Sequence, residues 1–310
     1  MPDLAVVIVS WNVRDLLAVC LRSLFVDLDQ AGLEAEVWVV DNASADGSAD
    51  MVAETFPAVH LIASDENLGF VRGNNLALDA ILRDTEHGIR NTPYVWLLNP
   101  DTEVLFGATA ALLAALKADP QAGMAGPKLL YPDGSLQHSA FHFPGLIQLI
   151  FDLFSLPARF YETPFNGRYP RHLYEGTTPF LIDHPLGASM MIKSLVLNDV
   201  GLMDEGFFMY CEEVDWCWRL RKAHWHIYCA PAARVIHHAG QSSAQVRTAS
   251  FVNLWTSRAR LYARHHGPLA WRLARALVRA GMRRRMKGAS PEMIDACRQV
   301  IHAWEGAKRK

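Results

Sequence analysis

Three apolar runs in the first third of the chain each stop at a cluster of polar residues. The clusters, in chain order, are Ser10-Trp11-Asn12, Asp41-Asn42 and Asn99-Pro100-Asp101. Their hydroxyl, amide and carboxylate groups are of the types that hold a ribose, a base edge or a divalent cation. In an open α/β sheet the carboxyl ends of parallel strands converge on one crevice, and ligands bind there. The pattern therefore favours a nucleotide-type site.

Asp41, at the end of the second run, can accept hydrogen bonds from a ribose hydroxyl or from the imide N–H of a base. The same residue type also caps turns and helices, and both readings stay open. A dinucleotide site would normally carry GxGxxG after the first strand, and a P-loop would read GxxxxGK followed by Ser or Thr. The chain has neither motif at that place, which argues against NAD, FAD and P-loop nucleotides.

Asp101 and Glu103 lie two residues apart after the third run. Carboxylates with this spacing at a strand end can bind Mg²⁺ or Mn²⁺, which usually pair with phosphate oxygens. A diphosphate leaving group needs such a cation to neutralise its developing charge. The alternative is that Asp101 only caps the turn after Pro100.

A second set of polar residues lies beyond residue 200. Glu212, Glu213 and Asp215 open a predicted helix, where carboxylates stabilise the macrodipole. One of them could instead act as a general base, with its pKa raised by burial and by like-charged neighbours. His237 and His238 follow a later strand, and an imidazole there could bind a metal. Because neighbours on a strand point to opposite sides, the pair is a weak signal for such a site.

Strand and helix signals alternate through this first third. Apolar runs predict strands at 4–10, 36–40, 59–63 and 94–98, and helical spacing predicts helices at 14–30, 72–83 and 107–118. A short helix is expected after Ser44–Gly47. The alternation predicts a mostly parallel sheet with helices on both faces, which is an α/β fold.

After residue 123 the pattern loosens. Residues 140–182 are rich in aromatic residues, Pro and Gly, and they predict an irregular insertion with a short amphipathic helix at 146–154. A helix is expected at 212–224, a strand at 226–237, and helices from about 250 onward. We therefore expect a domain at 1–250 and a basic helical extension at 251–310. A long ordered loop is often functional, so the insertion is expected to form part of an acceptor side.

Seven segments, taken in order, resemble a known family. They are VVIVSWN at 6–12, VVDNASADGS at 39–48, ENLGFVRGNN at 66–75, LLNPDT at 97–102, GASMMIK at 187–193, GLMDEGFFMYCEEVDWCWR at 201–219 and VIHHAGQSS at 235–243. Together they span roughly residues 4–245 and resemble a family 2 glycosyltransferase of the GT-A fold, especially its bacterial rhamnosyltransferase-like branch. The resemblance implies a Rossmann-like, mostly parallel sheet with helices on both faces.

The resemblance also implies a role for each matching residue. The donor nucleotide and sugar would be held by Ser10, Asn12, Asp41, Asn67, Gly69, Gly73, Asn74 and Asn99. Asp101 would bind the cation, Mg²⁺ or Mn²⁺, with His237 as a second ligand and Glu103 assisting. The usual DxD motif has Asn99 at its first position here, so a single carboxylate could carry the metal. Glu213 matches the general base, and Asp215 is the alternative because Glu stands where the family usually has Asp.

The implied reaction is an inverting, metal-dependent transfer from a nucleoside-diphosphate sugar to a hydroxyl of a glycan or lipid-linked acceptor in cell-envelope polysaccharide synthesis. The resemblance favours dTDP-rhamnose as the donor, with UDP-hexoses and GDP-mannose as alternatives. Two other functions are a non-catalytic binder of nucleotide sugars or glycans and a sugar-nucleotide pyrophosphorylase. The acidic residues at 212–215 argue against a binder. The missing Gly-rich, basic signature near the N-terminus argues against a pyrophosphorylase.

Charge is distributed unevenly along the 310 residues. Residues 258–310 hold 14 of the 30 Lys and Arg residues and three of the 32 acids, which makes this part +11 and the rest −13. Basic residues alternate with Leu and Trp at helical spacing over 258–287, which is typical of a helix lying on an anionic membrane. The alternative is a solvated face packed against the acidic body. No aromatic-basic module for nucleic acid is visible, so no nucleic-acid partner is expected.

The five cysteines are scattered and form no CxxC pair. With a strand beginning at once after the N-terminus, no cleavable signal pattern is visible, and no apolar stretch reaches the roughly 18–20 residues that span a bilayer. These features predict a cytoplasmic protein with free thiols, peripheral on the cytoplasmic face of the inner membrane.

Overall fold

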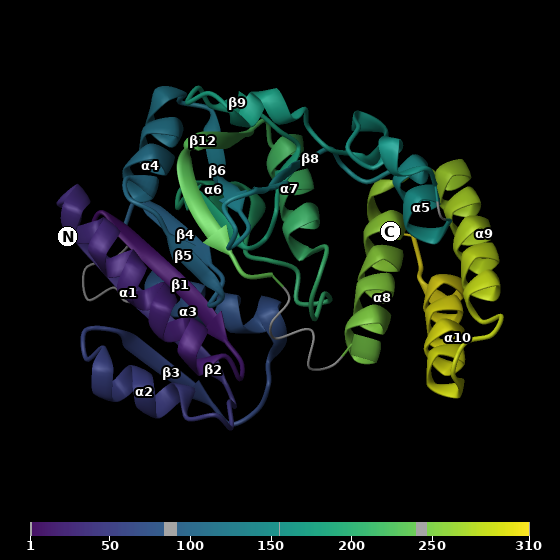
Figure 1. Ribbon diagram of the computed structural model, residues 1–310, viewed down its shortest axis with the longest axis horizontal. Coiled ribbons are helices and arrows are strands. Elements are labelled where there is room, and N and C mark those ends of the chain that lie inside the picture. The colour runs from purple at the N-terminus through teal and green to yellow at the C-terminus, as the bar shows by residue number, and fades with distance from the viewer. Residues whose placement is uncertain (1, 84–91, 155, 240–246, 310) are drawn as a thin grey trace.

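The computed structural model describes residues 2–83, 92–154, 156–239 and 247–309. Its first part alternates strands and helices as the sequence predicts (Figure 1). The elements are β1 (Leu4–Ser10), α1 (Arg14–Ala31), β2 (Ala35–Asn42), α2 (Ser48–Thr55), β3 (His60–Ser64), α3 (Gly69–Arg83), β4 (Tyr94–Leu98), β5 (Thr102–Val104) and α4 (Ala108–Ala118). The four strands and three long helices predicted for this part are confirmed.

The central sheet is mixed. Strands β3, β2, β1 and β4 are neighbours and parallel, with Ser10 paired to Asp41 at the end of the β1–β2 ladder. Beyond β4 the order continues with β11 (Ser189–Lys193), β6 (Ala122–Leu130), β12 (His226–His237) and β5. Strand β11 is antiparallel to both β4 and β6. The parallel half therefore gathers its carboxyl ends at one edge, as the first third of the sequence indicates.

Helices cover both faces of the sheet. Alternate residues of the central strand point to opposite sides, so each set packs against different helices. On β1, Leu4, Val6 and Ile8 pack in a core with α1 and α4. Ala5 and Val7 pack in a second core with α3 and with α7 (Glu212–Lys222). Buried strands of this kind read as continuous apolar runs rather than as alternating patterns.

Residues 136–200 are built from short elements, and they include the segment 140–182 for which composition predicts an irregular insertion. They are β7 (Leu136–Gln137), β8 (Ala140–Phe141), α5 (Leu146–Leu153), the 3-10 turns η1 (Ala158–Phe160), η2 (Pro164–Asn166) and η3 (Arg171–Tyr174), β9 (Phe180–Leu181), β10 (His184–Pro185), and α6 (Val196–Val200) after β11. The predicted helix at 146–154 is confirmed as α5. It packs away from the sheet, against the C-terminal helices (Figure 1).

The chain ends in three helices, α8 (Arg247–His265), α9 (Pro268–Arg285) and α10 (Pro291–Gly306). Together with α5 they form a bundle beside the sheet, which we call the helical bundle (Figure 1). Its core is aromatic: Trp271 stacks on Trp304 at 5.3 Å between ring centroids, and Trp304 Nε1 donates to Trp255 O at 2.8 Å. The bundle thus joins the predicted basic extension to a helix of the 140–182 insertion.

The bundle corrects one expectation for the basic segment. The sequence predicts that the apolar side of 258–287 faces a membrane, yet Trp271, Val278 and Met282 of α9 are buried in the bundle core. The large apolar side chains of α9 that remain exposed are Leu269 and Leu273, by 70% and 46%. Helices α5, α8 and α10 cover the apolar side of α9, which an isolated helix would present to lipid. Among the described residues, no helix has the length and apolar composition to cross a membrane.

Candidate active site

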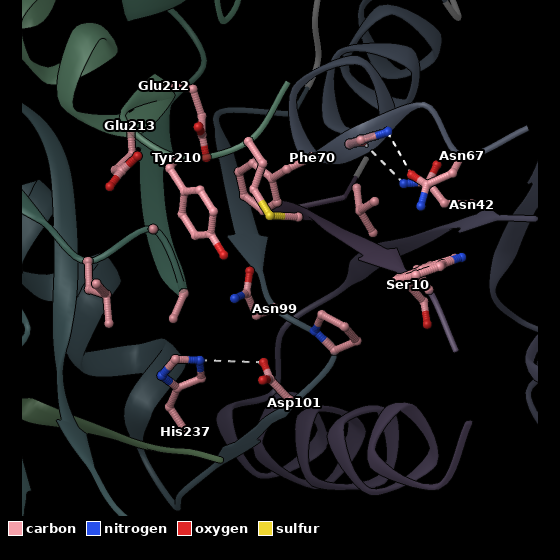
Figure 2. Close-up of a pocket in the computed structure, with 18 residues that line it drawn as sticks. Ser10, Asn42, Asn67, Phe70, Asn99, Asp101, Tyr210, Glu212, Glu213 and His237 are labelled. Carbon is pink, nitrogen blue, oxygen red and sulfur yellow. Dashed lines mark hydrogen bonds and ion pairs between the residues drawn. The ribbon is translucent and has the colours of Figure 1, made fainter. Parts of the chain in front are cut away.

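A cavity of about 290 Å³ opens at the carboxyl ends of β1 and β4 (Figure 2). Seven of the predicted site residues line it, namely Ser10, Asn67, Gly69, Asn99, Asp101, Glu213 and His237. The other six, which are Asn12, Asp41, Gly73, Asn74, Glu103 and Asp215, do not. The cavity lies where the carboxyl ends of parallel strands are expected to form a ligand crevice.

Three buried oxygens near the ends of β1 and β2 have no hydrogen-bond partner in the described residues. They are Ser10 Oγ, Asp41 Oδ1 and Asn42 Oδ1. Ser10 and Asn42 line the cavity, and Asp41 sits beside Asn42 on the same strand. Because an unpaired buried polar atom is costly, the two in the cavity lining, with a third on the adjacent residue, favour a polar ligand here.

Asn12 and Asp41 hold the loop after β2 instead of lining the cavity. Asn12 Oδ1 accepts from Ala45 N at 2.8 Å, and Asn12 N donates to Ser44 Oγ at 3.0 Å. Asp41 Oδ2 accepts from Ser44 N at 2.9 Å, which is the turn-capping role left open by the sequence. Both residues therefore shape the site from behind its wall.

The start of α3 approaches the neighbouring segments closely, and its two glycines make this possible. Gly69 has a φ of +75°, and a Cβ there would lie 2.7 Å from Phe208 O. At Gly73 a Cβ would lie 2.9 Å from Val9 Cγ1. Asn74, predicted to bind the donor, instead donates to Phe70 O at 2.8 Å inside α3. Gly73 and Asn74 thus support the cavity wall from outside its lining.

Replacing Gly69 with Ala is expected to weaken nucleoside-diphosphate binding by at least about tenfold, because a 1 Å displacement of α3 changes the cavity wall. Gly107→Ala is a matched control: its φ is +79°, but a Cβ there meets nothing within 4 Å. Calorimetry of ligand binding and thermal unfolding would be measured for both. Both variants carry the cost of a left-handed residue, about 1 kcal/mol. Equal affinities in the two would contradict the role of the Phe208 contact.

At the opposite end of the cavity from α3, Asp101 and His237 face each other, with Asp101 Oδ1 and His237 Nε2 3.4 Å apart (Figure 2). Both side chains are largely buried. His237 Nδ1 lies 3.0 Å from Gln137 Oε1, to which it can donate, and this leaves the Nε2 lone pair facing the carboxylate. Two ligands of one Mg²⁺ at adjacent positions lie about 3 Å apart, so the pair fits two positions of a divalent cation.

Glu103, predicted to assist the metal, is engaged elsewhere. His238 Nε2 contacts Glu103 Oε1 at 2.6 Å, and neither residue lines the cavity. Asp101 lies in the turn before β5, so strand alternation does not bring Glu103 to the same side. Within the described part of the chain no group of three His, Cys, Asp or Glu side chains is placed to hold a metal. Gly240 and Ser242 of the VIHHAGQSS segment lie outside the described residues.

A tight turn before α7 brings two glutamates to the cavity. Tyr210 and Cys211 have φ values of 70° and 66°, which are left-handed, and α7 begins at the next residue, Glu212. Tyr210 points its hydroxyl into the cavity, with Glu212 and Glu213 beyond it (Figure 2). Glu212 Oε2 and Glu213 Oε2 are buried without a partner among the described residues.

Burial raises the pKa of Glu213 to about 7. Burial and the adjacent charge of Glu213 also raise the pKa of Glu212 well above its usual range. A carboxylate whose pKa lies near neutral pH and which has an unpartnered oxygen in a cavity is suited to accept a proton from a substrate hydroxyl.

Asp215, the alternative base, is fully buried and faces away from the cavity. Its carboxylate contacts Arg219 Nε at 3.0 Å, Arg264 Nη1 at 3.2 Å and His265 Nε2 at 2.7 Å. Burial opposes its ionisation, but the hydrogen bond from His265 and the two arginine charges outweigh burial and lower the pKa of Asp215. Its oxygens are therefore used within the protein.

The cavity is also lined by residues that were not among the predicted site residues, among them Trp11, Asn42, Tyr210 and Glu212. Asn42 could have been found, because it follows Asp41 on a strand and neighbours on a strand point to opposite faces. Nothing in the local sequence marks Tyr210, whose direction depends on two left-handed residues in succession.

A model of glycosyl transferase family 2 matches residues 5–186. An N-acetylglucosaminyl-diphospho-decaprenol L-rhamnosyltransferase of Mycobacterium tuberculosis is 30% identical over 269 residues, which cover 80% of this chain and 85% of that protein. A low-salt glycan biosynthesis hexosyltransferase, Agl10, of Haloferax volcanii is 25% identical over 77% of this chain and 68% of its own length.

Solved structures share the fold. The GalNAc-T7 structure with UDP, GalNAc and Mn²⁺ aligns with a TM-score of 0.58 at 16% identity, over 76% of this chain and 43% of that chain. The mannosyltransferase PcManGT of Pyrobaculum calidifontis, in complex with GDP-Man and Mn²⁺, aligns with a TM-score of 0.53 at 15% identity. The alignment covers 98% of this chain and 86% of that chain. The chain thus belongs to glycosyl transferase family 2 and is a GT-A glycosyltransferase similar to a bacterial rhamnosyltransferase.

Proposed function

We propose that the enzyme transfers rhamnose from dTDP-rhamnose, with inversion, to a sugar hydroxyl of a lipid-linked acceptor. The observation that carries the proposal is that one cavity is lined by both the Asp101–His237 pair and Glu213, whose carboxylate has an unpartnered oxygen. The mycobacterial relative, named for the transfer of L-rhamnose to N-acetylglucosaminyl-diphospho-decaprenol, supports this choice of donor and acceptor.

In this proposal Ser10 and Asn42 bind the nucleotide, while Asp101 and His237 lie at the diphosphate. A divalent cation on these two residues would neutralise charge on the leaving diphosphate. Glu213 removes the proton of the acceptor hydroxyl while the oxygen of that hydroxyl attacks the anomeric carbon of the donor sugar. The bond from that carbon to the diphosphate oxygen breaks on the opposite face, and the nucleoside diphosphate leaves. One displacement inverts the anomeric configuration.

The test supplies N-acetylglucosaminyl-diphospho-polyprenol with dTDP-rhamnose, UDP-glucose, UDP-N-acetylglucosamine or GDP-mannose in turn. Product mass and anomeric NMR would identify the sugar and the stereochemistry. We expect transfer from dTDP-rhamnose with an inverted anomeric centre. Transfer from another donor alone would contradict the assignment of rhamnose, and retained configuration would contradict the single displacement.

The same proposal includes docking of the helical bundle on an anionic membrane, where a lipid-linked acceptor resides. Arg272 and Arg283 of α9 are exposed and form no ion pair among the described residues, and Leu269 and Leu273 are exposed on the same helix. Each cation near an anionic surface contributes about 1 kcal/mol.

Replacing Arg272 and Arg283 together with Gln is therefore expected to weaken binding to phosphatidylglycerol-containing vesicles by about tenfold or more. Arg22→Gln with Lys117→Gln removes the same charge from α1 and α4, away from the bundle, and should leave binding unchanged (Figure 1). Co-sedimentation with vesicles of graded anionic content measures both. Equal losses of vesicle binding in the two double variants would show that binding depends only on net charge, and would contradict docking through α9.

A further inference from the structure

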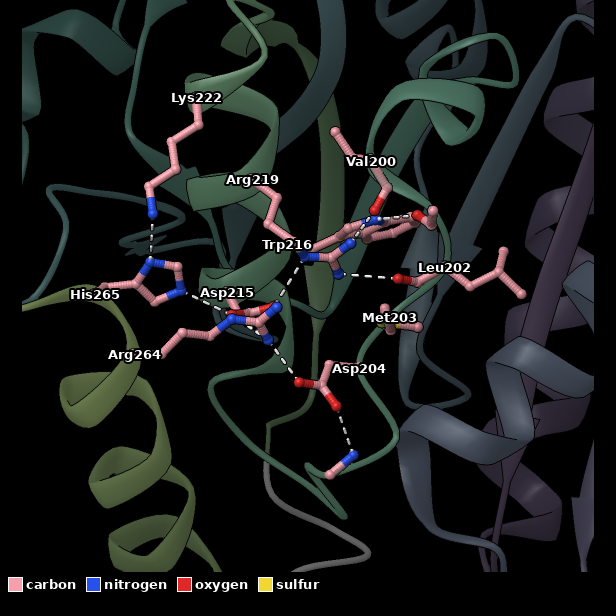
Figure 3. Close-up of polar contacts among 12 residues, drawn as sticks. Val200, Leu202, Met203, Asp204, Asp215, Trp216, Arg219, Lys222, Arg264 and His265 are labelled. Carbon is pink, nitrogen blue, oxygen red and sulfur yellow. Dashed lines mark hydrogen bonds and ion pairs between the residues drawn. The ribbon is translucent and has the colours of Figure 1, made fainter. Parts of the chain in front are cut away.

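Helix α8 of the helical bundle contacts the chain on both sides of Glu213. Before it, Ser257 Oγ donates to Met209 O at 2.8 Å, and Arg260 Nη2 donates to both oxygens of Asp204 at 2.9 and 2.8 Å. After it, His265 Nε2 lies 2.7 Å from Asp215 Oδ1. Arg264 bridges the two sides by pairing with Asp204 and with Asp215 (Figure 3).

The turn between these contacts needs support from outside. Tyr210 and Cys211 both have left-handed backbone conformations, which are unfavourable for residues other than glycine. Strained backbone persists only where the surroundings over-determine it. Here Asp204, Met209 and Asp215 are all bound by side chains of α8, so the strained turn is spanned by one rigid helix.

The contact of His265 with Asp215 is itself well defined. The His265 ring is 1% exposed and stacks on Trp218 at 4.5 Å between centroids. Its Nδ1 lies 3.4 Å from Lys222 Nζ, which can only donate, so Nε2 carries the proton that is donated to Asp215. Both ring nitrogens are thereby used, and the first turn of α7 is fixed about its axis.

We propose that His265 and Arg264 are positioning residues, which act through Asp215 and Asp204 to hold Glu213 toward the cavity and so make catalysis depend on the docked helical bundle. The inference rests on the proposed role of Glu213 as the base. Asp215 lies two residues after Glu213 in the first turn of α7, so a shift of Asp215 turns Glu213 with it. A displacement of about 1 Å at a reacting group can lower a rate about 100-fold.

His265→Ala is expected to lower kcat by about 10- to 100-fold while the dissociation constant of dTDP changes less than about threefold, because Asp101, His237 and Ser10 are untouched. His265→Gln, whose amide can still donate to Asp215, should recover most of kcat. Arg258→Gln is the matched control, because Arg258 lies on the same helix but pairs with Asp152 of α5 at 2.8 Å. It should leave kcat unchanged.

Asp204→Asn provides a second variant if His265→Ala does not fold. Asp204 is less buried than Asp215 and pairs with Arg260 and Arg264, and its loss should lower kcat in the same direction. Unchanged kcat in the folded variants, or an equal loss in Arg258→Gln, would overturn the proposal. Glu213→Gln is run beside them: if that variant remains active the base assignment fails, whereas an inactive Glu213→Gln with a fully active His265→Ala overturns the positioning role alone.

Discussion

Glu213→Gln is expected to lower kcat by about 1000-fold, within the range that general-base catalysis contributes. Gln keeps the shape of the side chain but cannot accept the proton. Nucleoside-diphosphate affinity should stay within about threefold of wild type, because the groups proposed to bind it, Ser10, Asn42, Asp101 and His237, are unchanged. Single-turnover transfer and calorimetry on the same samples would separate the two effects.

The pH dependence of the wild-type enzyme follows from the same group. Burial raises the pKa of Glu213 to about 7, so the rate should fall as pH is lowered through about 7. Glu205→Gln is the control, because Glu205 is an exposed carboxylate in the segment that leads to the turn. It should keep both the rate and the pH profile. A Glu213→Gln enzyme that transfers sugar at the wild-type rate would exclude Glu213 as the base.

Stability supplies an independent check that Glu213→Gln is folded. The native state binds the Glu213 proton more tightly than the unfolded state does, so this carboxyl stabilises the fold fully below about pH 4.5, and its contribution is lost as pH rises to about 7. The Gln variant has no such charge. Its melting temperature should therefore equal or exceed that of wild type at pH 8, and a lower value there would indicate a packing defect.

Local sequence patterns predicted the strands and helices of the first third of the chain. Strand β1 is apolar because both its faces are covered, and its polar end is the site because the neighbouring strands are parallel. The direction of β11 could not be read in the same way. Its segment has the same apolar character as a parallel strand, and only the path of the chain through residues 136–188 makes it antiparallel to β4.

The site residues divide in the same way, into those placed by local sequence and those placed by distant segments. Ser10, Asn99 and Asp101 follow strands directly, so their positions depend on strand ends that the sequence marks. Asp215 could not be separated from Glu213 by sequence, because the partners that use its carboxylate, Arg264 and His265, come from a helix about 50 residues away. The buried stripe of α9 was equally hidden, since α5 lies more than 100 residues earlier in the chain.

Asp101→Asn is expected to weaken Mn²⁺ binding in the presence of dTDP by more than about 30-fold and to lower kcat/KM by more than about 100-fold. The amide keeps the size of the side chain but removes the negative charge that faces His237 Nε2 at 3.4 Å. Electron paramagnetic resonance of Mn²⁺ measures the binding directly, without turnover.

Glu103→Gln is the matched control for Asp101→Asn. It removes one carboxylate charge two residues away, from a side chain that is bound by His238 and does not line the cavity. If the metal is held by Asp101 and His237, Glu103→Gln should bind Mn²⁺ within about threefold of wild type, because a screened charge outside the ligand set contributes little. Equal losses in both variants would instead mean that the cation responds to the general field of this strand end. Full Mn²⁺ binding by Asp101→Asn would show that the diphosphate holds the cation without this carboxylate.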